Sequence, residues 1–501
     1  MNNNHNINGE NRVPLLQEVA AANGSIVLKH DEDDEQYKSS SSSVSRRVWI
    51  ESKKLWHIVG PSILQRVATY SMNIVTQAFA GHLGKVELAS ITISNSVICG
   101  LSFGLFLGMA SALETLCGQA FGAKRYRMLG IYMQRSWIIL FLTCILLLPL
   151  FIFATPIMKA IGQPEDVAKQ TGVLALWFIP LHLSFAFQFP IQRFLISQLK
   201  TGVLAWVTLP VFGFHILASW LSVKFGFGVV GLAIVLDISW WLVFLGLFGY
   251  ATLGGCPQTW TGFSIQAFSE LWEFLKLSIA SGVMLCLENW YYRILLLMPG
   301  LLKNKTVAVD ALSICMNISG WEMMIPFAFF AATGVRVANE LGAGNGKAAR
   351  FATIVSVIQS TIIGIIFCIF IMVFHHKFGM IFSSDPEVLK AAAKLSYLLA
   401  ATILLNSVQP ILSGVAVGSG WQSRVAFVNI GCYYLVGLPL GVLMGTVLHG
   451  GVEGIWGGMI FGGTALQTIV LAILTCRSDW ESEAKKATTN VEKWSDDPIE
   501  Q

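Results

Sequence analysis

Twelve long apolar stretches occupy the sequence between residues 55 and 475. Each stretch is long enough to cross about 30 Å of hydrocarbon as an α-helix. The stretches are continuous and do not alternate in ten-residue segments, so the pattern excludes a β-barrel. They lie at 55–79, 88–113, 129–153, 168–190, 203–222, 229–250, 271–298, 308–333, 351–374, 391–414, 425–447 and 453–475. The sequence therefore predicts an all-α, polytopic membrane protein with twelve transmembrane helices in a lipid bilayer.

Composition supports this class and excludes several others. Hydrophobic residues make up 54% of the 501 and charged residues only 12%, which leaves too few polar side chains to cover a soluble fold. The net charge is +4 and Lys and Arg form no single basic face, which argues against a nucleic-acid partner. The nine cysteines stand singly, and the sequence contains no catalytic or metal-ligating constellation. We therefore expect neither an enzyme nor a bound cofactor or metal.

Polar segments at the two ends and in the middle predict the domain boundaries. Residues 1–50 are polar, with an acidic run and a serine run, and predict a disordered tail. Residues 51–250 hold helices 1 to 6 and residues 271–476 hold helices 7 to 12. A linker rich in Gly, Thr and Ser joins these lobes at 251–270, and residues 477–501 form a second tail. An even number of spans places both tails on one side of the membrane.

Basic residues in the short loops predict which side that is. The richer set of loops includes Lys124, Arg125, Lys347 and Arg350, and both tails adjoin the same side. Because positively charged loops remain in the cytosol, both termini are expected to be cytosolic.

The chain also repeats itself at a spacing of about 221 to 224 residues. Several short motifs recur at this offset: ELASI at 87–91 and DALSI at 310–314, PEDV at 164–167 and PEV at 386–388, GVVG at 228–231 and GVEG at 451–454. A constant offset across several helices predicts two six-helix lobes in parallel orientation. Two such lobes are expected to rock against each other around a central cavity, which is alternating access.

Glu288 is the most informative single residue, because LCLENWYYR places this carboxylate inside an apolar segment of more than 20 residues. An ionised acid at that depth costs several kcal/mol unless it is protonated, paired or in contact with water. One interpretation is a neutral acid that locks two helices together by hydrogen bonds. The other is a proton or cation site in a transport pathway.

Other polar residues near Glu288 in the sequence point to the second lobe as the place of proton chemistry. Tyr292 lies four residues on and shares a helix face with Glu288, so its phenol could hydrogen-bond the acid. Arg293 is one residue further and points elsewhere, towards a partner such as Glu322. Asp310 and Glu322 flank the next segment, and together with Glu288 they are the candidate proton-coupling residues.

Several motifs resemble the plant branch of the multidrug and toxic compound extrusion (MATE) transporters. They are CLENWYY at 286–292, GVRVANELGAGN at 334–345, LETLCGQAFGA at 113–123 and NSVQPILSGVAVGSGWQ at 406–422, and the resemblance covers about 50–480. It implies twelve helices in two lobes around a V-shaped cavity, and export of organic solutes against inward proton or sodium flow. By matching position, Glu288 corresponds to the family's acid in the seventh helix and Asp310 to the acid that opens the eighth.

Two positions depart from that pattern. Asn406 stands where many relatives have a carboxylate in the tenth helix, and Arg293 where some have a second acid in the seventh. Each change removes a titratable acid from the cavity, and Arg293 adds a positive charge. Anionic cargo becomes more plausible, and the 406–422 motif resembles the subgroup that includes vacuolar flavonoid carriers and tonoplast chloride conductors.

The leading hypothesis is a proton-coupled antiporter that moves flavonoid-like metabolites or xenobiotics out of the cytosol and functions as a monomer. Glu288 would carry the proton, with Asp310 and Glu322 relaying it. The expected substrate pathway comprises Asn289, Tyr292, Arg293, Asn317, Asn406 and Gln409. The resemblance favours the vacuolar membrane over the plasma membrane. The alternative hypothesis is a passive anion conductor in which Arg293 and Arg66 attract chloride.

Overall fold

The computed structural model describes residues 43–298, 305–383 and 385–495. Every regular element in these ranges is helical. Nine stretches of these ranges are long and apolar enough to cross a membrane, and the bent pair α7 (Glu165–Trp177) and α8 (Ile179–Ser197) makes a tenth. Helix also covers the other two predicted segments, as α2 (Val44–Leu83) and α11 (Leu271–Leu297). The predicted all-α membrane fold is therefore confirmed.

The first lobe comprises the helices that precede the linker. After α2 come α3 (Lys85–Ile93), the π-helical η1 (Ser94–Cys99), α4 (Gly100–Gly122), α5 (Tyr126–Ile152), α6 (Ala154–Ala160), α7, α8, α9 (Thr201–Lys224) and α10 (Gly228–Tyr250). The linker contains η2 (Ala251–Gly255) and η3 (Ile265–Phe268).

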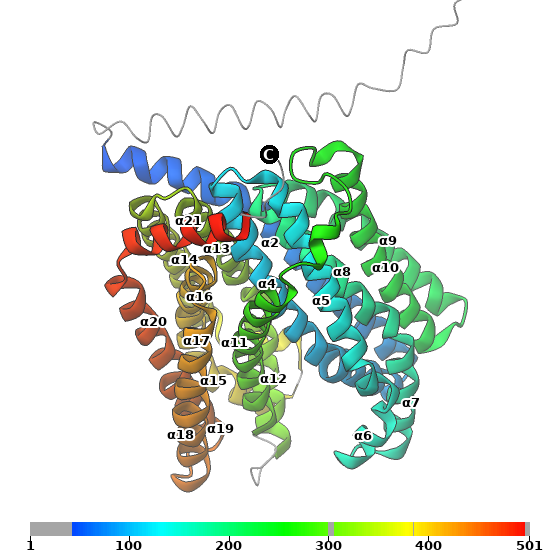
Figure 1. Cartoon of the computed structure of the whole chain (residues 1–501). Helices are drawn as coiled ribbons and strands as arrows, with labels where there is room; N and C mark the ends of the chain where they lie inside the picture. Colours follow the sequence, from blue (N-terminus) through cyan, green and yellow to red (C-terminus); the bar gives the residue numbers. More distant parts are fainter. Residues whose placement is uncertain (1–42, 299–304, 384, 496–501) are drawn as a thin grey trace, which may run out of the picture.

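The second lobe begins with α11. It continues with α12 (Lys305–Glu322), α13 (Met324–Gly342), α14 (Gly346–Phe374), η5 (Phe378–Ile381), α15 (Pro386–Asn406), α16 (Gln409–Gly418), α17 (Gln422–Asn429), η6 (Ile430–Gly437), α18 (Leu438–Val442), η7 (Leu443–Val447), α19 (Gly451–Met459), η8 (Ile460–Ala465) and α20 (Leu466–Arg477). Figure 1 shows α5 to α10 on one side of the molecule and α14 to α20 on the other.

The internal repeat is visible in the backbone as well as in the sequence. Residues with left-handed φ angles recur in the two lobes at offsets of 220 to 223 residues. The pairs are Lys124 and Gly344, Leu199 and Gly420, Gly226 and His449, and Gly228 and Gly451. Each pair ends or begins a helix at the equivalent place, so the two lobes share one order of helices and turns.

Glycines let α4 and α13, which are equivalent helices of the two repeats, cross at very close range. A methyl group on Gly122 would collide with the carbonyl oxygen of Asn339, and one on Gly342 with that of Gln119. These two contacts are the same contact with the repeats exchanged, because each residue lies 220 positions from its counterpart. A pseudo-two-fold axis therefore passes between α4 and α13.

The same axis brings together two equivalent positions that differ. Glu114 on α4 directs Oε1 into the space that a side chain at Gly334 on α13 would need. The other carboxylate oxygen pairs with Arg193 of α8 at 2.5 Å, and both charged side chains are almost completely buried. The first lobe thus keeps a charged group where the second keeps only a hydrogen atom.

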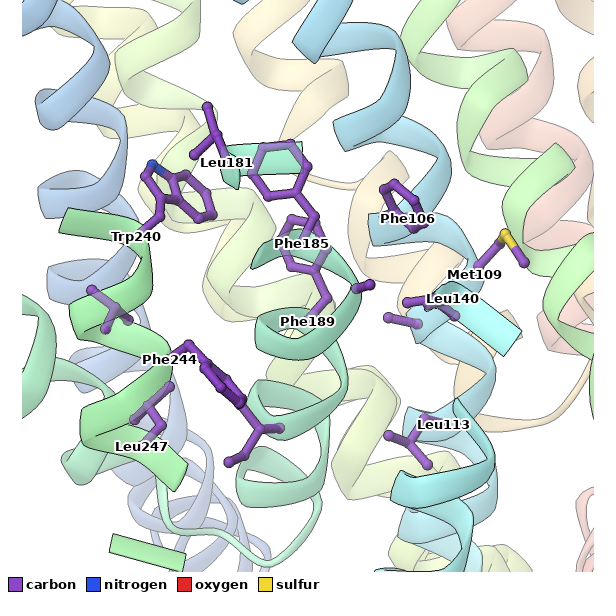
Figure 2. Close-up of a cluster of buried hydrophobic side chains, with 14 of the residues drawn as sticks. Phe106, Met109, Leu113, Leu140, Leu181, Phe185, Phe189, Trp240, Phe244 and Leu247 are labelled. Atoms are coloured by element: carbon purple, nitrogen blue, oxygen red, sulfur yellow. The ribbon is translucent and has the colours of Figure 1, made fainter. Parts of the chain in front are cut away.

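Aromatic side chains form much of the apolar core of the first lobe (Figure 2). The Phe185 ring meets Trp240 of α10 edge-on at 5.0 Å and stacks against Phe189 at 5.5 Å. Phe103 of α4 meets Phe189 edge-on at 5.1 Å. Such pairs add about 0.5–1.5 kcal/mol each beyond their burial, so α4, α8 and α10 are held as one unit.

Helical structure extends into both predicted tails. Residues 44–50 belong to α2, and α21 (Trp480–Ser495) packs against α13 and α14 with Trp480, Ala484 and Ala487 buried. The mean hydropathy of α21 is low, because its charged residues outnumber those of a narrow apolar stripe. Residues 1–42 and 496–501, the remainder of the predicted tails, lie outside the described residues. In Figure 1 α21 and the start of α2 lie at the same end of the molecule.

Candidate functional site

Glu288 lies near the middle of α11 with 7% of its surface exposed. Its Oε1 accepts a hydrogen bond of 2.9 Å from Nε2 of Gln409, and the same amide group donates to Ser413 at 3.0 Å. Gln409 is available because the chain breaks between α15 and α16, which brings the first residue of α16 to α11. Within the described part of the chain, Glu288 Oε2 is buried without a hydrogen-bond partner.

Tyr292 belongs to the same cluster but not through the predicted bond to Glu288. Its phenol donates to Oδ1 of Asn406 at 3.2 Å and lies 3.2 Å from the hydroxyl of Thr464. Helix periodicity therefore predicted the wrong hydrogen-bond partner for Tyr292. The α15–α16 break places both Asn406 and Gln409 against α11, where Asn406 binds the phenol and Gln409 binds one oxygen of the carboxylate.

A second chain of hydrogen bonds lies in the same lobe and also ends on α11. Tyr433 donates to Gln467 at 2.9 Å, and Gln467 donates to Asn429 at 2.8 Å. Asn429 in turn donates to the carbonyl of Met284 on α11 at 2.9 Å. Tyr291 stacks on Tyr433 with ring centroids 4.4 Å apart. The sequence analysis missed Tyr433, Gln467 and Asn429, although polar side chains inside apolar segments were the available signal.

Asn289 and Arg293 form a second group on the face of α11 that meets the first lobe. Arg293 donates through Nε to Asn289 at 3.1 Å and through a terminal nitrogen to the carbonyl of Ser96 in η1 at 2.7 Å. Gly100 and Gly104 of α4 leave room for these two side chains. Arg293 therefore contacts the first lobe and not the predicted partner Glu322, and this contact links the two lobes.

The candidates on α12 join neither group. Asp310 and Asn317 are exposed, while Glu322 is buried with Oε2 lacking a partner among the described residues. No hydrogen bond or ion pair in these ranges connects the three to Glu288. Arg66 was the other residue expected to attract anions. It lies close enough to the buried pair Glu114 and Arg193 to interact electrostatically with both side chains.

The two lobes are joined at the end that carries the basic loops. Gln119 of α4 donates to the carbonyl of Gly418 at 3.2 Å, and Asn339 of α13 donates to that of Ser197 at 3.5 Å. These two bonds are equivalent contacts with the two repeats exchanged. Thr115 adds a third bond between the lobes, to the carbonyl of Val417 at 2.6 Å.

A buried ion-pair network reinforces this closure. Arg336 of α13 binds both carboxylate oxygens of Glu51 of α2, at 2.9 and 3.1 Å, and also Glu340 at 2.7 Å. Glu51 belongs to the first lobe and Arg336 to the second. Planar two-point pairing is the strongest geometry available to arginine. The sequence analysis did not identify this pair, because the partners are 285 residues apart.

Two repeated helical lobes that are joined at one end, with a buried acid in the middle of α11, are the arrangement of a membrane transporter. Comparison with known proteins agrees. The MatE family model matches residues 61–221 and 280–443. Protein DETOXIFICATION 27 of Arabidopsis thaliana is 61% identical over 97% of both chains, and Protein DETOXIFICATION 26 is 61% identical over 90% of this chain and 92% of its own.

Solved structures agree with these relatives. The crystal structure of the eukaryotic MATE transporter AtDTX14 is 34% identical, with a TM-score of 0.84 over 89% of this chain and 99% of its own. The chain therefore belongs to the multidrug and toxic compound extrusion (MATE) family of transporters.

Proposed function

We propose that the chain is a proton-coupled antiporter that moves organic metabolites or xenobiotics, flavonoid-like molecules among them, out of the cytosol. The observation that carries the proposal is Glu288 Oε2, a buried carboxylate oxygen without a partner among the described residues. An unmet buried polar atom costs about 1–3 kcal/mol. Glu114 also has one such oxygen, but its carboxylate is paired with Arg193, whereas no ion pair among the described residues offsets the charge of Glu288. A site that must gain and lose a proton leaves one oxygen available.

The hydrogen bond from Gln409 supports this role. Its amide N–H can donate to Glu288 Oε1 whether the acid is ionised or neutral, so the side chain keeps one position in both states. Protonation of Oε2 would then change the charge of the cluster without rearranging its geometry. The neutral acid also has a lower free-energy cost of burial than the carboxylate while the lobes move.

The remaining candidates would line the route of substrate and proton. Asn289 and Arg293 face the first lobe and present donors to hydroxyl-rich or anionic solutes. Tyr292, Asn406 and Gln409 would contact solute beside Glu288. Asp310, Asn317 and Glu322 lie on α12, and Asp310 and Glu322 would relay protons. We further propose that one chain is sufficient, that its termini are cytosolic, and that it acts in the vacuolar membrane.

The test is transport in sealed proteoliposomes with a labelled flavonoid glucoside, while internal pH is followed. Substrate flux should follow an imposed pH gradient in the wild type and disappear in Glu288→Gln, which keeps the shape of the side chain. Glu387→Gln, at an exposed position of α15, is the matched control and should transport normally. If chloride crosses under a voltage with no dependence on pH, the anion-conductor hypothesis replaces the antiporter.

A further inference from the structure

A cavity of about 410 Å³ lies beneath the linker on the first lobe, away from the acid cluster. Its walls come from α5, α8 and the segment 263–268 of the linker. Eight of its ten lining residues are apolar, and Trp137, Phe141, Phe187 and Phe263 supply most of the aromatic surface. The volume lies within the range of about 300–1,000 Å³ that is usual for small-ligand sites.

The polar side chains around the cavity are used to hold the linker. Gln134 donates to the carbonyl of Gly262 at 3.0 Å and accepts from the amide of Ser264 at 2.9 Å. Its neighbour Arg135 donates to Ser269 at 2.9 Å. A water needs two to four polar partners to occupy a cavity. Because Gln134 is committed to the backbone, the cavity favours an apolar occupant over water.

Three apolar linker residues that line the cavity also expose much of their surface on the outside of the molecule. Phe263 is 77% exposed, Ile265 89% and Phe268 68%. Phe141 of α5 continues this surface towards the other lipid-facing residues of the lobe. An exposed apolar patch of this kind marks contact with a partner or a membrane. In a membrane-spanning fold the patch is continuous with the surface that meets hydrocarbon.

The depth of the cavity indicates which leaflet it meets. Gln134 lies eight residues after the first residue of α5, which corresponds to about 12 Å along the helix. The basic loop with Lys124 and Arg125 immediately precedes that helix, at the predicted cytosolic side. The cavity therefore lies below the headgroups of the cytosolic leaflet and at the level of its acyl chains.

We propose that this cavity binds one acyl chain of a phospholipid from the cytosolic leaflet. The chain fills the apolar space between α5 and α8, while its headgroup stays at the membrane surface beside the linker. The linker leads directly into α11, which carries Glu288, so an occupied cavity supports the segment that joins the moving lobes. This role is separate from the proton and substrate sites.

The experiment uses the full chain in proteoliposomes that contain phosphatidylcholine with a photoactivatable diazirine in its acyl chain. Adducts are mapped by peptide mass spectrometry. We expect several-fold more adducts at Ile138, Phe187 and Ile265 than at Ile365 and Ile369, which are lipid-exposed on α14. Adducts at the cavity should also saturate and be displaced by unlabelled phosphatidylcholine, whereas those on α14 should not.

Ile138→Trp fills the cavity and Ile365→Trp is its matched control on α14. The first variant should lower labelling of Phe187 and Ile265 at least fivefold and leave α14 unchanged, and the second should leave the cavity labelled. Equal labelling of cavity and α14 in the wild type, or no saturation, overturns the proposal. So does undiminished labelling in a folded Ile138→Trp protein, and the wild-type measurements decide alone if that variant does not fold.

Discussion

Glu51→Gln tests whether the ion-pair network controls the closure between the lobes. The substitution keeps the size of the side chain and removes the charge that Arg336 contacts across the interface. Arg336 retains Glu340 on its own helix, so it is not left as an isolated buried charge. The change therefore weakens the contact between lobes while each lobe stays intact.

The expected magnitude follows from the geometry. Two charge-assisted hydrogen bonds become at most one weaker bond from the guanidinium to an amide oxygen. A hydrogen bond to a charged group contributes about 1.5–3 kcal/mol, so we take about 2 kcal/mol as the loss. That free energy corresponds to about a 30-fold shift towards the state in which the lobes separate at this end.

The assay is pulsed electron resonance between spin labels at Arg127 of the first lobe and Lys347 of the second, both exposed at that end. The variant should populate a longer distance than the wild type. Glu453→Gln, which breaks an exposed ion pair to Lys394 within the second lobe, should leave the distance unchanged. If Glu51→Gln gives the wild-type distribution, the ion pair does not hold the lobes together.

Three further predictions concern other contacts. Gly342→Val should prevent the crossing of α4 and α13 and abolish transport, whereas Gly249→Val, with open space around it, should not; normal transport by Gly342→Val would refute the crossing. Tyr292→Phe removes the donor to buried Asn406 and should lower thermal stability in detergent by about 1–3 kcal/mol, with exposed Tyr397→Phe as the neutral control. Truncation after Ser478 removes α21 and uncovers Trp421, so the melting temperature should fall; an unchanged value would show that α21 does not support the fold.

The sequence predicted the helices and the acid because both signals are local. Glu288 stands out within one apolar segment, and each span is a continuous run. The partners of Tyr292 and Arg293 could not be predicted in this way. They depend on the break between α15 and α16 and on the π-helical turn η1, and neither bend follows from composition.

Contacts between distant segments were hidden for a related reason. Glu51 and Arg336 each resemble ordinary loop-side charges until the repeats are folded onto each other. The motif around Arg336 was recognised as a family feature, but its role in joining the lobes required the structure. The α21 helix was missed because its apolar stripe is narrow and its charges dominate the average.

The contact between Glu114 and Gly334 bears on how the two repeated halves fit together. Two identical halves could pair across the same axis, since the crossing of α4 and α13 is reciprocal. With Glu114 in both copies, two buried carboxylates would meet at the axis, and with glycine in both, the partner of Arg193 would be lost. The difference at this pair of positions makes the two halves complementary, so neither half could pair across this axis with a second copy of itself.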